Sequence, residues 1–149
     1  MYFNNKINYL FIIGFFCILD QLSKIYINYN FNKLLNRDLL IITIEYLRNY
    51  GAAFNIFSGN RLFLTFISII STITLSYLIF ISENKNINKY GLSLILSGTI
   101  GNGIDRILYG YVIDFIKIKF IDFPVFNIAD IVINLGVLIL IKSYLSYKS

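Results

Sequence analysis

The chain has 149 residues, of which 57% are hydrophobic and 14% are charged, and its mean hydropathy is +0.69. A soluble domain of this size would expose far too much apolar surface to water, so the composition predicts a membrane protein. The net charge of +5 comes from scattered basic residues beside apolar segments, which favours contact with anionic phospholipid over binding of nucleic acid. The chain has no histidine and a single cysteine, so we expect neither an internal disulfide nor the usual histidine base.

Four apolar stretches are long enough to cross a bilayer as helices, because a span needs about 20 residues at 1.5 Å each. They cover approximately residues 9–27, 62–81, 92–108 and 128–144. The first stretch lacks the small residues of a signal-peptide cleavage site, so we expect it to be retained. The predicted fold class is an all-α membrane protein with one domain over residues 1–149, built as a four-transmembrane-helix bundle with a small β element.

The first predicted span carries Asp20, Gln21 and Lys24 on one helical face near its end. Asp20 and Lys24 are four residues apart, which is the spacing that permits an ion pair. Such a pair can be purely structural, because pairing makes two charges tolerable near the membrane interface and a lysine can extend to the headgroups. It can also border a functional site.

Residues 28–60 form the longest segment outside the predicted spans. After a polar start, residues 39–47 have the composition of a strand, and residues 48–51 and 58–60 have the composition of turns. We therefore expect a small β element within residues 33–60, lying on one membrane face.

The second and third predicted spans differ in their polar content. The second has no charged residue, and its Ser and Thr side chains can bond to their own helix carbonyls, so we expect it to serve packing. The third has Gly98, Gly101, Asn102 and Asp105 at helical spacing, which places small and polar groups on one inward face. Arg106 follows and can either pair with an acid or extend to the headgroups.

Two aspartates, Asp114 and Asp130, follow the third span. The segment from Asp114 alternates apolar and basic side chains as a surface strand does, which places Asp114 at the mouth of the bundle. Pro124 favours an extended backbone before it, and Asn127 can cap the fourth span, so Asp130 lies in the first turn of that helix. Taken alone, the helix dipole could account for a carboxylate there.

Antiparallel packing of the four spans brings the carboxylates and Asn49 to one membrane face. Each lies at the corresponding end of a span or in the loop beside it: Asp20, Asn49, Asp105, Asp114 and Asp130. Two carboxyl groups that share a site cannot both ionise easily, so a pair can hold one proton and act as general acid and base. The alternative is a small transporter or channel subunit, because intramembrane charges also mark ion pathways.

These residues resemble the motifs of the lipoprotein signal peptidase (signal peptidase II) family, bacterial intramembrane aspartic peptidases that remove signal peptides from prolipoproteins. The resemblance covers nearly the whole chain and rests on motifs in a fixed order. They are DQLSK at 20–24, NYGAAF at 49–54, GNGIDR at 101–106 leading to GYVIDF at 110–115, and FNIAD at 126–130. Ser97 and Phe123 depart from the glycine and tryptophan common in the family, and neither position bears on the aspartates.

The resemblance implies that Asp114 and Asp130 are a catalytic dyad that needs no metal, cofactor or covalent intermediate. It implies that the other motif residues shape or support the site: Asp20 with its partner Lys24, Asn49, Gly51, Asn102, Asp105, Arg106, Asn127 and Ala129. The implied substrate is a prolipoprotein with a diacylglyceryl-modified cysteine, cleaved just before that residue. We expect the enzyme to act as a monomer.

The implied location is the bacterial cytoplasmic (inner) membrane, with the active site and the β element at the extracytoplasmic face and both termini in the cytoplasm. Basic residues usually flank spans on the cytoplasmic side, and their count here favours the opposite orientation. We follow the family, because several of the basic residues on the motif face belong to the motifs themselves.

Overall fold

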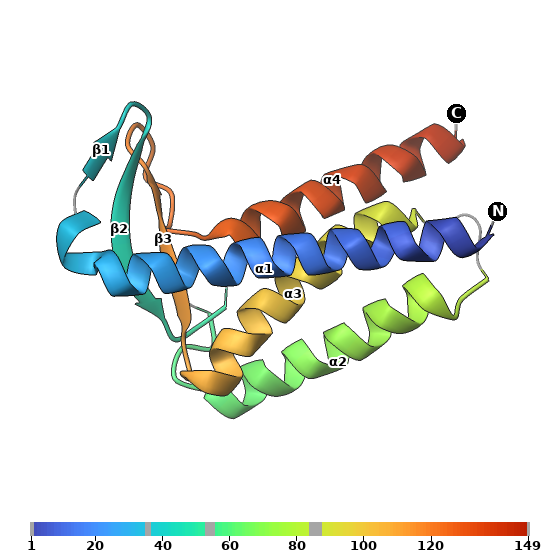
Figure 1. Ribbon diagram of the computed structural model, residues 1–149, viewed down its shortest axis with the longest axis horizontal. Coiled ribbons are helices and arrows are strands. Elements are labelled where there is room, and N and C mark those ends of the chain that lie inside the picture. The colour runs from blue at the N-terminus through green and yellow to red at the C-terminus, as the bar shows by residue number, and fades with distance from the viewer. Residues whose placement is uncertain (1, 35–36, 53–55, 84–87, 149) are drawn as a thin grey trace.

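The computed structural model describes residues 2–34, 37–52, 56–83 and 88–148. Within them the chain forms α1 (Tyr2–Leu34), β1 (Arg37–Leu39), β2 (Ile42–Asn49), α2 (Arg61–Phe80), α3 (Lys89–Leu108), β3 (Val112–Ile118) and α4 (Ile128–Lys148). The helices run lengthwise, and the sheet crosses one end of them (Figure 1). The predicted class, a helical membrane protein with a small β element, is confirmed.

Among the described residues, three helices are long and apolar enough to span a membrane: α1 over Asn5–Asn30, α2 over Arg61–Phe80 and α4 over Ile128–Tyr147. The chain is therefore a multi-pass membrane protein. α3 also reaches about 30 Å at 1.5 Å per residue, but it carries glycines and polar side chains on its buried face. Since α1, α2 and α4 all pack on it, α3 is the central helix, and its crossing of the bilayer stays a prediction.

Small residues set the distance between α3 and α4. A Cβ added at Gly136 would lie 2.6 Å from the carbonyl oxygen of Gly91, and one at Gly98 would lie 2.5 Å from that of Ala129. Neither position accepts a side chain without separating the two helices. The glycines of the third predicted span therefore do face inward, as expected, and they let the polar residues of α3 approach the start of α4.

The sheet has the order β1-β2-β3 with both pairs antiparallel. The strand predicted over residues 39–47 is confirmed as β2 from Ile42 onward, but its start is wrong, because Leu39 ends β1 and the chain turns at Leu40 and Ile41. No Gly, Asn, Asp or Pro marks this turn, so composition gave no signal for it. The strand predicted from Asp114 is confirmed as β3, and it extends the sheet beyond residues 33–60.

The first helix is longer than the predicted span of residues 9–27 and continues through a polar segment to Leu34. The sheet covers this end of the helix, since Ile27 is buried together with Ile113 and Phe115 of β3. Packing against the sheet thus supplies the stabilisation that the polar sequence lacks. Asp20 consequently lies in the body of α1 and not near its end, which corrects the predicted position.

Candidate active site

Asp114 and Asp130 come from different elements and line the same cavity. Asp114 lies in β3, and Asp130 lies in the first turn of α4, as predicted. Backbone hydrogen bonds between Ile116 and Phe126 hold the segment before α4 against β3, so α4 begins beside Asp114. The cavity has a volume of about 1170 Å³ and lies between the sheet, α2, α3 and α4.

Polar and apolar side chains both line the cavity. Polar lining residues include Asn49, Ser68, Ser71, Thr99, Asn102 and Arg106. The apolar wall includes Ile67 of α2 and Ile131, Leu135 and Leu138 of α4. The second span packs on α3 as expected, and its Ser68 and Thr72 side chains donate to carbonyl groups of their own helix. One face of α2 also lines the cavity, which the sequence did not indicate.

Each of the four dyad oxygens accepts one N–H group. Asp114 accepts from Asn127 Nδ2 at 2.7 Å and from Asn49 Nδ2 at 2.9 Å. Asp130 accepts from Asn102 Nδ2 at 2.9 Å and from the backbone N–H of Asn127 at 3.1 Å. In return Asn127 Oδ1 accepts from the backbone N–H of Asp130 at 3.0 Å, so the predicted cap is confirmed. The two carboxylates are thus joined through their donors.

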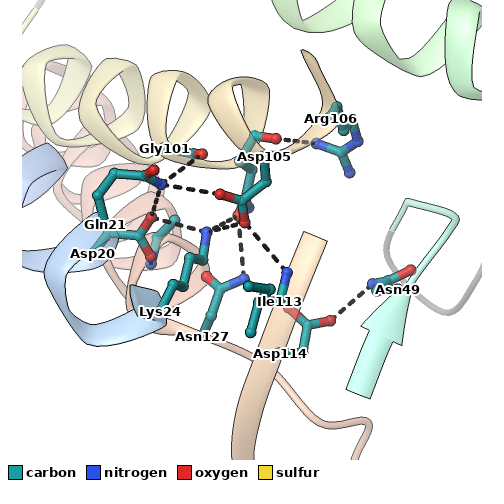
Figure 2. A network of polar contacts seen from close by, with 12 residues as sticks. Asp20, Gln21, Lys24, Asn49, Gly101, Asp105, Arg106, Ile113, Asp114 and Asn127 are labelled. Atoms are coloured by element: carbon teal, nitrogen blue, oxygen red, sulfur yellow. Dashed lines mark hydrogen bonds and ion pairs between the residues drawn. The ribbon is translucent and has the colours of Figure 1, made fainter. Parts of the chain in front are cut away.

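A buried lysine lies between Asp20 and Asp105 in a network of polar contacts (Figure 2). Lys24 is 2% exposed, and its Nζ lies 2.8 Å from Asp20 Oδ2 and 2.9 Å from Asp105 Oδ2. The predicted ion pair of Lys24 with Asp20 is confirmed, and Asp105 is a second carboxylate partner of Lys24. Nζ also donates to Asn102 Oδ1 at 2.9 Å. Burial excludes the alternative in which Lys24 extends to the headgroups.

The two carboxylates around Lys24 also hold the backbone beside the dyad. Asp20 Oδ1 accepts from the N–H of Ala129 at 2.9 Å, and Asp105 Oδ2 accepts from the N–H of Ile113 at 3.2 Å. Ala129 and Ile113 each directly precede one of the dyad aspartates. Asp20 and Asp105 therefore connect the buried lysine to both chain segments that carry the dyad.

Gln21 belongs to this network, although the sequence analysis did not assign it to the site. Its Nε2 donates to Asp20 Oδ2, Asp105 Oδ1 and the carbonyl oxygen of Gly101, each at 3.1 Å. A Cβ added at Gly101 would lie 2.5 Å from Asp20 Oδ2, so only glycine fits there. The available signal was the place of Gln21 between Asp20 and Lys24 on one helical face.

Gly51 connects Asn49 with Arg106. Its N–H donates to Asn49 Oδ1 at 2.9 Å, which turns Asn49 Nδ2 toward Asp114. Its carbonyl oxygen accepts from Arg106 Nη2 at 3.1 Å, so this arginine holds a loop and does not extend to the headgroups. Arg61, which the sequence analysis did not single out, donates to two carbonyl groups in the last turn of α3.

The environment of Asp114 favours its protonated form. Burial raises the pKa of Asp114, and the neighbouring Asp130 raises it further, while hydrogen bonds from Asn49 and Asn127 and the charge of Lys24 oppose the shift. The resulting pKa is about 7. The pair can therefore hold one proton up to neutral pH.

The chain is similar to bacterial signal peptidases over most of its length. A family model described as signal peptidase (SPase) II matches residues 12–146. A lipoprotein signal peptidase of Clostridium tetani (strain Massachusetts / E88) is 42% identical over 132 residues, 83% of each chain. Another, of Lactobacillus johnsonii (strain CNCM I-12250 / La1 / NCC 533), is 41% identical over 144 residues, 95% of this chain and 93% of the relative.

A solved structure of a bacterial membrane enzyme has a TM-score of 0.84 to this fold at 37% identity, over 95% of this chain and 90% of that one. These matches do not support the alternative of a transporter or channel subunit. The motifs, the fold and the relatives agree, and this chain belongs to the signal peptidase II family.

Proposed function

We propose that this chain is an aspartic endopeptidase that removes signal peptides from prolipoproteins, with Asp114 and Asp130 as its catalytic dyad. One observation carries the proposal. Two carboxylates from different elements line one cavity, and each of their oxygens accepts one N–H donor. The donors hold both groups in place and leave each oxygen a further lone pair for a proton, a water or a substrate.

The dyad works with one shared proton. The ionised carboxylate takes a proton from a water, which attacks the scissile carbonyl, while the protonated carboxyl donates its proton to the developing oxyanion. The tetrahedral intermediate then collapses. The carboxyl that received the water proton gives it to the leaving amine, and the hydroxyl of the intermediate returns a proton to the other carboxylate. The pKa of about 7 at Asp114 supports a protonated partner at neutral pH.

The remaining motif residues hold the dyad in its working geometry. Asn49, Asn102 and Asn127 donate to the carboxylates, and Gly51 and Arg106 fix Asn49. Behind them Asp20, Lys24, Asp105 and Ala129 tie α1, α3 and the start of α4 together. All of these contacts are intramolecular, so these residues act as supports in this proposal.

The shape of the cavity suits a lipidated peptide. Its apolar wall on α4, with Ile131, Leu135 and Leu138, faces Ile67 of α2 and can take acyl chains. The same cavity is lined by the dyad and by Asn49, the last residue of β2. We propose that the substrate carries a diacylglyceryl-modified cysteine and is cleaved just before it.

We further propose that residues 1–149 form one peptidase domain that crosses the bacterial cytoplasmic (inner) membrane four times as a monomer surrounded by phospholipid. The dyad then faces the extracytoplasmic side, and both termini lie in the cytoplasm. In support, α1 begins and α4 ends at the end of the bundle opposite the sheet (Figure 1). Single cysteines at Leu40 and Glu83 in a Cys17→Ser background test the orientation. An impermeant thiol reagent should label position 40 in intact cells, and labelling of position 83 alone would overturn it.

The test of the activity is cleavage of a synthetic precursor by the purified, reconstituted protein. We expect a precursor with a diacylglyceryl-modified cysteine to be cut directly before that residue, and the unmodified precursor to be left intact. No group of three His, Cys, Asp or Glu side chains among the described residues could hold a metal ion, so chelators should leave the rate unchanged. Loss of activity with a chelator and its recovery with zinc would overturn the dyad mechanism.

A further inference from the structure

Three of the four N–H groups on the dyad belong to side-chain amides, and an amide can present either its N–H groups or its carbonyl oxygen. Two of the three, Asn49 and Asn127, are fixed by backbone N–H groups that donate to their Oδ1 atoms. Asn102 differs, because its Oδ1 accepts from Lys24 Nζ at 2.9 Å and from Asn127 Nδ2 at 3.1 Å. Its direction therefore depends on two side chains.

We propose that Lys24 is a positioning residue whose ammonium group holds Asn102 with Nδ2 toward Asp130. An ammonium group only donates hydrogen bonds, so Asn102 must turn its carbonyl oxygen to Lys24 and its N–H groups to the dyad. The direction of Asn102 in turn suits Asn127, because the same oxygen accepts from Asn127 Nδ2. This inference rests on the proposed function, since it assigns a role within that dyad.

Lys24 also reaches both chain segments of the dyad through its carboxylate partners. Asp20 accepts from the backbone N–H that precedes Asp130, and Asp105 accepts from the one that precedes Asp114. Both carboxylates are almost fully buried, at 0% and 1% exposed, so they keep these contacts only while a cation compensates them. Lys24 does not line the cavity and therefore acts without touching the substrate.

The charges that face the dyad determine how loss of Lys24 would alter its proton affinity. Lys24 and Asp20 act on it from α1, and Arg106 acts on it from α3. Asp105 of α3 contacts Lys24. Loss of the ammonium group removes a nearby positive charge and frees Asn102 to turn its oxygen to Asp130. Both changes favour the protonated dyad, so the pH at which the dyad loses its proton should rise.

The experiment compares wild type, Lys24→Arg and the charge-matched variant Lys24→Met/Asp105→Asn at equal amounts of folded protein. The charge-matched variant should lose about 10- to 100-fold in kcat with an unchanged KM for the diacylglyceryl-modified precursor. The alkaline limb of its pH profile should move up by about one unit. Lys24→Arg keeps the positive charge, so the alkaline limb of its pH profile should stay at the wild-type pH. A folded charge-matched variant with the wild-type kcat and limb would overturn the proposal.

Asn102→Asp decides the question if the charge-matched variant does not fold. It keeps an oxygen toward Lys24 and replaces the N–H group on Asp130 with an oxygen, so the alkaline limb should again move up. Wild-type turnover with an unshifted limb would overturn the proposal. The infrared carbonyl band of the protonated dyad gives a readout besides activity, and it should disappear at higher pH in both variants. If Asp114→Asn cleaves normally, the proposed function fails. The pH at which the carbonyl band disappears still tests the role of Lys24 in that case.

Discussion

Two pairs of carboxylates lie close together in this protein, and their surroundings differ. Asp20 and Asp105 flank the ammonium group of Lys24 and accept hydrogen bonds from neighbouring backbone and from Gln21. Within the described part of the chain, Asp114 and Asp130 accept only from amide N–H groups, and both line a cavity. A full positive charge compensates the first pair, whereas amides compensate the second pair only partly, so that a proton must be shared.

The comparison teaches that the residue type alone does not identify a catalytic carboxylate. Asp20, Asp105 and Asp114 are all at most 1% exposed, so burial does not separate the pairs either. What separates them is the partner and the access to a cavity that could admit water and substrate. The following experiments test that distinction, beginning with the largest expected effect.

Asp114→Asn and Asp130→Asn should each lower cleavage by about 100-fold or more, because an amide cannot exchange the proton that general acid–base catalysis requires. The double variant should be scarcely worse than either single variant, since the two groups act as one unit. The measurement is turnover of the diacylglyceryl-modified precursor, with folded, membrane-inserted protein matched by amount. Near-normal turnover in either variant would remove that aspartate from the dyad.

Lys24→Met should destabilise the fold by about 3–5 kcal/mol, because it leaves two buried carboxylates without their cation. Denaturant unfolding in detergent measures the effect, with Asp114→Asn as the comparison. Asp114→Asn keeps the shape of the side chain and removes no cation, so its loss should be much smaller. Equal stability of the two variants would mean that the ion pairs of Lys24 with Asp20 and Asp105 do not stabilise the fold more than the dyad does.

Gly101→Ala should destabilise the protein by about 1–3 kcal/mol, because the added methyl group has to displace the Asp20 carboxylate. Gly14→Ala is the matched control, since a Cβ there meets nothing within 4 Å. In that open position alanine should be neutral or slightly stabilising, because it restricts the unfolded chain. If the two substitutions behave alike in thermal unfolding, close packing around Asp20 does not determine stability.

Cleavage should fall by about tenfold per pH unit above neutral pH, because the dyad loses its shared proton there. Activity should decrease and not increase with pH because of Asp114, whose pKa rises from the ordinary 3.8 to about 7 in the folded protein. Between these values the folded state binds more protons than the unfolded state, so this group also makes stability decrease as pH rises. Measuring kcat/KM and the free energy of unfolding over a pH series checks both predictions. Asp114→Asn should abolish this group's contribution to the pH dependence of the free energy of unfolding. A flat profile up to pH 9 would contradict a dyad that shares one proton.

Much of this site is readable from short-range spacing. Composition predicted the membrane, and the motif residues predicted the family and the dyad. The pairing of Asp20 with Lys24 and the cap at Asn127 also follow from local geometry, because four residues make one helical turn and a cap acts within three positions. Such contacts form wherever the helix forms, so the sequence by itself determines them.

The tertiary structure alone decided the contacts between distant segments. Asp105 as second partner of Lys24, the direction of Asn102 and the place of Gln21 depend on how α3 packs against α1. The cavity face of α2 depends on its packing against α3, since its small hydroxyl side chains suit packing and a cavity wall equally well. A spacing along the chain fixes which residues share a helix face, but only packing fixes which face meets which neighbour, and an amide takes its direction from the donors it meets there.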